Sequence, residues 1–423
     1  MPHAHFKEKG LTFKMTETAK KLEAPELSAN RSRRLWMAIV LGSLVAFGPL
    51  SLDMYLPALP IIAENMQSST SMVQLSLTAC LIGLSVGQLF AGPISDVRGR
   101  RGPLLVGLII YAISSILCAV APSIWTFVLL RFIQGLAGAA GIVIARAMVR
   151  DMYEGSELTK FFALLMLVNG VAPIAAPIFG GQLLHFTSWE GVFIVLSLIG
   201  VLMFVVVMFG LPETLPTERR SKAGLSNTLS TFARLVKDRN FMGYALAQGL
   251  VTAAMFAYIS GSPFVFQEIY GVSPAMFSVI FAVNGLGIIL ASQITGRLAG
   301  KVTELKLFIF GISLATVSGL VLLAMILLQG NLFALLVPLF FVVSSVGIVG
   351  ATGFSLAMQN QSQAAGSASA LQGLISFISG GLVAPLVGIG GSSTAVPMGI
   401  VIAATTICAV LVNTFLIRSR KNA

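Results

Sequence analysis

Residues 92–102 read GPISDVRGRRG, a short polar stretch between two long apolar runs near 71–93 and 103–121. Its single acid, Asp96, is followed by three arginines. Arginine forms charge-assisted hydrogen bonds to carboxylates and to the carbonyl groups at helix ends. We therefore expect a tight turn between two helices that these charges hold together. A freely solvated loop is the simpler alternative, but the ordered spacing of glycine, acid and arginine disfavours it.

Apolar runs like these two recur along the whole chain. Hydrophobic residues make up 56% of its 423 residues and charged residues only 10%, with a mean hydropathy of +0.91. The balance typical of a soluble protein is therefore absent. A helix of about 20 apolar residues crosses the hydrocarbon core of a bilayer. Such runs lie near 35–56, 71–93, 103–121, 123–147, 160–185, 190–211, 241–264, 274–297, 305–328, 331–354, 366–390 and 394–417.

The longest polar break, residues 212–240, separates the first six runs from the last six. The sequence thus predicts an all-α integral membrane protein with twelve transmembrane helices in two pseudo-symmetric six-helix bundles. The expected parts are a cytoplasmic tail at 1–34, bundles at 35–211 and 241–417, a cytoplasmic linker at 212–240 and a cytoplasmic tail at 418–423.

Inside the linker, apolar residues recur at helical spacing among polar ones; they are Leu225, Leu229, Phe232 and Leu235 or Val236. This spacing predicts a short amphipathic helix. The helix would lie along the inner membrane surface or, more simply, tether the two bundles without touching the membrane.

Positive charge alternates with the predicted spans. The net charge is +11, and Lys and Arg collect in both tails, in the linker and in every second loop. Arg146, Arg150 and Lys160, for example, are assigned to the loop between the fourth and fifth runs, whereas the intervening loops contain no Lys or Arg. By the positive-inside rule, both termini and the linker are cytoplasmic. The charge therefore indicates orientation in a membrane rather than nucleic-acid binding.

The tail and the cysteines add little. Residues 1–30 lack the apolar core of a signal peptide, and Met15 is a candidate for the true start. The three cysteines and three histidines show no metal-ligand spacing. We expect no metal and no cofactor.

Asp53 and Arg131 are the charged residues placed deepest in the apolar runs. A charge near the bilayer centre costs about 2.5–3.5 kcal/mol on lenient insertion scales, so such residues are candidates for ion or substrate handling. Asp53 lies towards the outer end of the first run, and a wetted interfacial acid is the alternative. Arg131 lies early in the fourth run, with Gln134 nearly on the same helix face. Its alternative is to extend to the outer surface.

The fifth run is built for bending and close contact. It carries two prolines one turn apart, which remove backbone donors and kink a helix. Such an irregular span should be buried against protein in the middle of the membrane. The residues concerned are Asn169, Gly170, Pro173, Pro177, Gly180 and Gly181.

Several of these segments together resemble the major facilitator superfamily. Residues 92–102 look like its cytoplasmic signature, with matches at Gly92, Asp96, Arg98, Gly99, Arg100 and Arg101. Residues 131–151 are similar to the fourth-helix motif of proton-coupled members. Residues 169–182 resemble the fifth-helix motif of antiporters, although Ala176 stands where many members have glycine. With DMYLPALP at 53–60, the whole chain looks most like multidrug exporters of the bicyclomycin-resistance type.

The resemblance implies roles for individual residues. Asp53 would be the proton-coupling acid and Arg131 its partner. The signature stretch would act as a cytoplasmic gate centred on the first half, because residues 296–301 of the second half repeat it without the acid. The antiporter motif would comprise Gly170, Pro173, Pro177, Gly180 and Gly181. The substrate cavity is expected to include Tyr55, Gln134, Asn169, Tyr244, Gln248, Met255, Phe256 and Tyr258, with plain packing as the alternative for each.

The predicted function is secondary transport rather than catalysis. We expect a monomeric proton antiporter, embedded in the lipid bilayer, that exports drugs, antibiotics or small hydrophobic or cationic metabolites across the bacterial cytoplasmic (inner) membrane by alternating access. A proton symporter or uniporter for a nutrient or metabolite on the same fold is the alternative. A membrane-embedded lipid-modifying enzyme is a distant third, since it needs clustered acids or histidines. The outer acids Glu64, Glu190 and Glu268 are scattered.

Overall fold

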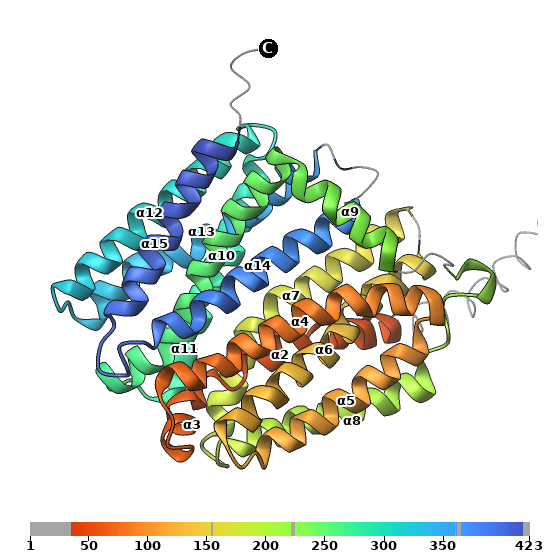
Figure 1. Ribbon diagram of the computed structural model, residues 1–423, viewed down its shortest axis with the longest axis horizontal. Coiled ribbons are helices and arrows are strands. Elements are labelled where there is room, and N and C mark those ends of the chain that lie inside the picture. The colour runs from red at the N-terminus through yellow and green to blue at the C-terminus, as the bar shows by residue number, and fades with distance from the viewer. Residues whose placement is uncertain (1–34, 154, 221–224, 360, 362–364, 418–423) are drawn as a thin grey trace, which may run out of the picture.

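The computed structural model describes residues 35–153, 155–220, 225–359, 361 and 365–417 (Figure 1). Residues 35–45 are helical and lead into the first labelled helix. The elements that follow are α2 (Phe47–Asp53), η1 (Leu56–Ala58), α3 (Leu59–Asn65), α4 (Thr70–Arg98), α5 (Arg101–Ala119), α6 (Ile124–Met152), α7 (Gly155–Leu183), α8 (Glu190–Gly210), η2 (Thr217–Arg219), α9 (Leu225–Lys237), α10 (Arg239–Phe264), η3 (Val265–Ile269), α11 (Pro274–Leu298), α12 (Glu304–Leu327), α13 (Leu332–Met358), α14 (Ala365–Val387) and α15 (Val396–Leu416).

The predicted fold class is confirmed. Eleven helices of the described chain are long and apolar enough to cross a membrane. The remaining predicted span is α7, which is 29 residues long and contains the apolar stretch Gly170–Leu183. Many of these helices begin at a side-chain cap that satisfies a free backbone N–H group; the caps include Ser69, Ser123, Ser273 and Asn331.

Several helices are longer than the sequence predicted, and two of these extensions bear on the site. The first span runs from Leu35 to Asn65 instead of ending near residue 56. Prolines open both η1 and α3, and in a first helical turn the missing N–H of proline costs no hydrogen bond. Similarly, α6 runs on to Met152 because no glycine or proline follows Gly141 within it. Arg146, assigned above to a loop, is therefore a helix residue.

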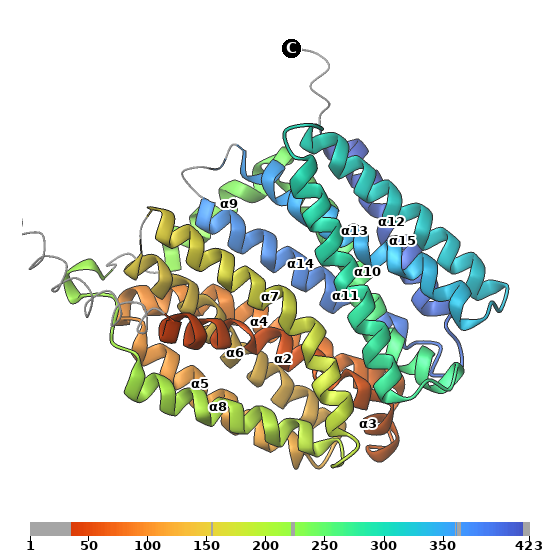
Figure 2. The same cartoon turned by 180° about the vertical axis from the view of Figure 1, so that it is seen from behind.

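The helices form two groups, as Figures 1 and 2 show from opposite sides. In the first bundle, α4 packs on α6, and α5 packs on α6 and α8. In the second, α10 packs on α14 and α15, and α12 packs on α13. The bundles meet where α4 contacts α14 and α7 contacts α11, while η1 reaches both α10 and α11.

We call the end that carries Gly99, Glu213 and α9 the linker end, and the end that carries Ser69, Ser123 and Ser273 the distal end. In the distal half, hydrogen bonds from side chains to backbone carbonyls join the bundles. They are Gln74 Nε2 to Ser260 O (3.0 Å), Thr78 Oγ1 to Gly381 O (2.8 Å), Ser71 Oγ to Pro385 O (3.0 Å), Ser278 Oγ to Pro177 O (2.7 Å) and Gln267 Nε2 to Pro57 O (3.2 Å). The two bundles are therefore held against each other at the distal end.

Helix α9 packs on protein. Phe232 and Leu235 are buried in one cluster with Phe241 of α10 and Leu371 of α14, and Leu89 of α4 packs against that cluster. Its other predicted apolar residues, Leu225 and Leu229, have side chains outside the described residues. The described part of the helix therefore packs on α10 and α14 of the second bundle, and Leu89 of the first bundle contacts the same cluster.

Candidate functional site

Asp53 lies at the end of α2, where the first span changes from α-helix to a 3₁₀ turn. It sits 12 residues before the distal end of the span at Asn65, about 18 Å at 1.5 Å per residue. The side chain is only 6% exposed. Asp53 is therefore deeper than the sequence indicated, because the span continues through the two prolines. The wetted interfacial alternative does not describe this structure.

Arg131 of α6 is completely buried, so it does not extend to the surface. One guanidinium nitrogen, Nη2, donates to the backbone carbonyl of Ser51 at 2.7 Å, and Nη1 donates to Oε1 of Gln134. The guanidinium carbon lies 4.2 Å from the centre of the Tyr55 ring and 5.6 Å from that of Phe193. Carbonyl, amide and aromatic groups thus replace water around this cation.

The partners of Arg131 are themselves held in place. Gln134 donates through Nε2 to Ser115 Oγ at 2.7 Å. The Ser51 hydroxyl lies 2.7 Å from the Tyr111 hydroxyl, and the Tyr55 hydroxyl lies 3.1 Å from Ser76 Oγ. Sequence reasoning named Tyr55 but missed the other hydroxyl residues, because serine and tyrosine also occur in apolar spans as ordinary packing residues; those missed are Ser51, Ser76, Tyr111 and Ser115.

Asp53 and Arg131 do not form an ion pair in the described structure. Ser51 and Tyr55 are one helical turn apart and face Arg131, whereas Asp53 is offset by two residues from each and so points to another side of the helix. On that side, Cys80 of α4 and the hydroxyl of Tyr258 in α10 lie within electrostatic range of its carboxyl group. Within the described residues, no hydrogen bond involves its carboxyl group. The acid therefore faces the contact between the bundles without a fixed partner.

Tyr258 brings the second bundle to this site. It is 1% exposed, stacks on Phe281 at 5.7 Å and accepts a hydrogen bond from Asn284 Nδ2 at 3.0 Å. Asn284 was not among the expected site residues, since one asparagine in an apolar run gives no spacing signal.

The other expected cavity residues are dispersed, most of them along the second bundle. Gln248 accepts a hydrogen bond from Gln372 at 2.5 Å, nearer the linker end. Tyr244 lines a separate pocket of about 250 Å³ at that end with Asp238 and Glu304. Phe256 packs on Phe377. Met255 is half-buried against the core, and the side chain of Asn169 lies outside the described residues.

Helix α7 packs between the break in the first span and the second bundle. A Cβ on Gly180 would collide with the backbone oxygen of Met54, the residue after Asp53. On its other side, a Cβ on Gly181 would meet Ser278 of α11 at 2.5 Å. The proline residues Pro173 and Pro177 lie within this helix, while Gly170 faces Ile289 of α11. The motif thus places backbone against backbone beside Asp53.

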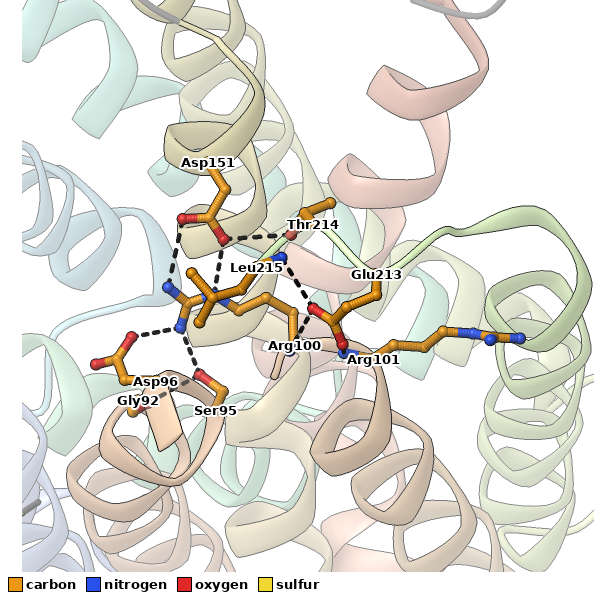
Figure 3. A network of polar contacts seen from close by, with 9 residues as sticks. All are labelled: Gly92, Ser95, Asp96, Arg100, Arg101, Asp151, Glu213, Thr214 and Leu215. Atoms are coloured by element: carbon orange, nitrogen blue, oxygen red, sulfur yellow. Dashed lines mark hydrogen bonds and ion pairs between the residues drawn. The ribbon is translucent and has the colours of Figure 1, made fainter. Parts of the chain in front are cut away.

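At the linker end, Arg100 organises the signature stretch (Figure 3). Its side chain donates to Asp96 Oδ1 at 2.5 Å, to Ser95 Oγ at 2.8 Å and to Asp151 Oδ2 at 2.8 Å. Arg101 donates to the backbone oxygen of Met208. Gly99 makes the turn with a φ of +91°, Gly92 accepts a hydrogen bond from Ser95, and Arg98 is exposed.

Glu213 completes this network from the segment after α8. Its carboxylate accepts hydrogen bonds from the backbone N–H groups of Arg100 (2.8 Å) and Arg101 (3.1 Å) at the start of α5, and of Leu215 (3.0 Å). Partial burial by itself raises the pKa of Glu213, but these donors and the charge of Arg220 together hold that pKa below its ordinary value.

All members of this network belong to the first bundle and the segment that follows it. Asp151 closes α6 and Glu213 follows α8, so sequence position alone did not connect them with the turn. In this structure the network joins α4, α5 and α6. It does not reach across to the second bundle among the described residues.

Comparison with known proteins agrees with this geometry. The family model of the Major Facilitator Superfamily matches residues 31–385. A protein of Bacillus subtilis named as an uncharacterized MFS-type transporter, YdgK, is 47% identical over 376 residues, or 88% of this chain and 93% of that protein. This chain belongs to the major facilitator superfamily.

Two further likenesses agree with this assignment, one in sequence and one in fold. The bicyclomycin resistance protein homolog of Haemophilus influenzae is 32% identical over 89% of this chain and 95% of its own length. A bacterial homologue of the lysosomal transporter Spinster superposes with a TM-score of 0.71 at 16% identity, covering 91% of this chain and 96% of that one, which supports the fold. As a major facilitator, the protein is a multi-pass membrane transporter of small molecules and not an enzyme.

Proposed function

We propose that this transporter exports drug-like or other small amphipathic molecules in exchange for protons. The observation that carries the proposal is Asp53, a buried acid inside the first span that faces the contact between the bundles and has no hydrogen-bond partner among the described residues. A carboxyl group in that place gains or loses a proton according to which side of the membrane wets it. Alternating access supplies that change of environment.

Two further features support export by antiport. A relative 32% identical over most of this chain carries the name of a bicyclomycin resistance protein homolog. In addition, the Pro- and Gly-containing helix α7 packs directly on the residue after Asp53. Rocking of α7 against α11 would therefore move the backbone next to the acid.

The orientation of the protein in the membrane is inferred from the distribution of its Lys and Arg residues. The arginines and lysines collect at the linker end, which we assign to the cytoplasm of a bacterial inner membrane. With the bundles joined at the distal end, the substrate would enter from the cytoplasm and leave after these hydrogen bonds break. One proton moving inward down 100 mV releases about 2.3 kcal/mol, enough for roughly 50-fold accumulation of a neutral solute.

The test is transport by purified protein in proteoliposomes that contain a pH-sensitive dye. Wild-type protein should move a substrate such as rhodamine 6G against its gradient and should move protons in the opposite direction. Asp53→Asn should abolish both fluxes. Glu64→Gln, which changes an exposed acid at the distal end of the same span, should abolish neither.

Two results would count against the proposal. Full proton-coupled export by Asp53→Asn would remove the acid from the mechanism. Protons and substrate moving in the same direction would instead identify a symporter.

A further inference from the structure

A groove on the membrane-facing side of the second bundle lies between α11 and α13. It has a volume of about 400 Å³ and is lined by Val279, Ile280, Val283, Asn284, Leu336, Val337, Phe340 and Phe341. Val337 is 60% exposed and Phe341 44%. Both are on spans whose outer surface faces lipid. The mouth of the groove therefore opens into the distal half of the hydrocarbon core.

Asn284 is the polar residue of this lining. It is 3% exposed, and its Nδ2 atom donates to the Tyr258 hydroxyl at 3.0 Å. Its Oδ1 atom accepts no hydrogen bond from the described residues. A carboxamide beside hydrocarbon is unfavourable unless both its donor and its acceptor find partners. The acceptor of Asn284 is thus available to a molecule in the groove.

On the side away from the groove, Asn284 contacts Tyr258, which lies toward Asp53. Tyr258 stacks on Phe281, and its hydroxyl lies within electrostatic reach of Asp53. Asn284 and Tyr258 therefore form a short chain of side chains that leads from the lipid-facing groove toward Asp53. This route does not pass through the hydrogen bonds that join the bundles at the distal end.

We propose that the groove is a substrate subsite that exchanges with the bilayer, and that Asn284 recognises a hydrogen-bond donor on an amphipathic solute dissolved there. A lipid acyl chain could fill the apolar walls but would leave Oδ1 of Asn284 without a partner. A solute with an amine or hydroxyl group satisfies both. A volume of about 400 Å³ also lies within the range of small-molecule pockets. This inference rests on the proposed export of amphipathic molecules.

The experiment measures equilibrium binding of rhodamine 6G, an amphipathic cation with N–H donors, to the full-length protein in phospholipid nanodiscs without any gradient. Val337→Trp fills the mouth of the groove from the lipid side. Val317→Trp is the matched control, because Val317 is 61% exposed on α12 and lies outside the groove. Asn284→Leu removes the amide and keeps a similar volume.

We expect Val337→Trp to bind one rhodamine molecule fewer per chain at saturation, and Asn284→Leu to bind that molecule at least tenfold more weakly. Val317→Trp should bind as the wild type does. Thermal unfolding of each variant establishes that it is folded.

Unchanged binding by Val337→Trp would show that the groove holds acyl chains only. Unchanged binding by Asn284→Leu would show that the amide of Asn284 makes no hydrogen bond to the bound rhodamine. An equal loss in Val317→Trp would mark a general effect of tryptophan at the lipid surface. Each of these results overturns the proposal.

Failure of the proposed function is distinguishable from failure of this inference. Asp53→Asn should lose proton-coupled transport and still bind rhodamine in the groove. If wild-type protein showed no proton flux but the groove variants changed binding as expected, the subsite would stand without the antiport mechanism.

Discussion

The guanidinium of Arg131 donates to the backbone carbonyl of Ser51 at 2.7 Å. Ser51 lies two residues before Asp53 on the first span. The buried Arg131 side chain therefore binds the backbone of the helix that carries Asp53 and does not pair with the carboxylate of Asp53 itself. In the proposed mechanism, Arg131 is therefore a positioning residue that fixes the helix just before its break and leaves the carboxyl group of Asp53 available for a proton.

Arg131→Lys should reduce the initial rate of proton-driven transport at least tenfold. Lysine keeps the charge but lacks the planar fork that reaches Ser51 and Gln134 while covering the Tyr55 ring. Arg150→Lys is the control, because Arg150 is an exposed residue of the same helix, and it should transport normally. Wild-type rates from Arg131→Lys would show that charge alone suffices.

Arg100→Ala should destabilise the protein by about 2–3 kcal/mol, because hydrogen bonds to charged groups are lost and Asp151 is left without its cation. Arg98→Ala changes an exposed arginine two residues earlier and should shift stability by less than about 0.5 kcal/mol. Thermal unfolding in one detergent measures both. Equal effects would mean that the network seen in Figure 3 contributes no more than a solvated loop.

Glu213→Gln should lower stability at pH 7 and have no effect at low pH. The pKa of Glu213 is held below its ordinary value of 4.5 in the folded protein. Its stabilisation is therefore complete above that value and is lost as the pH falls through the lowered pKa. Because the group is largely exposed, the difference at pH 7 should be about 1 kcal/mol or less.

Unfolding temperatures recorded between pH 7 and strongly acidic pH measure this convergence. Glu64→Gln, at the other end of the molecule, should show no comparable difference at any pH. A constant gap between wild type and Glu213→Gln down to strongly acidic pH would contradict the assignment of the charge.

Gly180→Ala should impair both transport and stability, by about 1–3 kcal/mol for the latter. The added methyl group collides with the Met54 carbonyl, so α7 must move away from the break beside Asp53. Gly373→Ala is the matched change, since a Cβ there meets nothing within 4 Å and alanine favours helix by up to about 1 kcal/mol. A Gly180→Ala protein as active and stable as Gly373→Ala would show that this close approach is dispensable.

Hydropathy was enough to predict the membrane class and the spans. The runs at 71–93 and 103–121 correspond closely to α4 and α5. Each span must form all its backbone hydrogen bonds within its own helix inside the hydrocarbon, so a continuous apolar run in the sequence is enough to identify it. Span ends were less predictable. Prolines at 57 and 60 and an arginine at 146 look like boundaries in sequence, yet each is compatible with a continuing helix.

The sequence by itself thus determined that the chain is a helical membrane protein with one deep acid, one deep base and a charged turn at 92–102. Only the tertiary structure decided that Arg131 holds Ser51, that Asp151 and Glu213 complete the turn, and that Asn284 lies between a lipid-facing groove and Tyr258. The physical reason is that a span apolar on every side carries no pattern that tells which face meets protein. That choice is made when helices distant in sequence pack together.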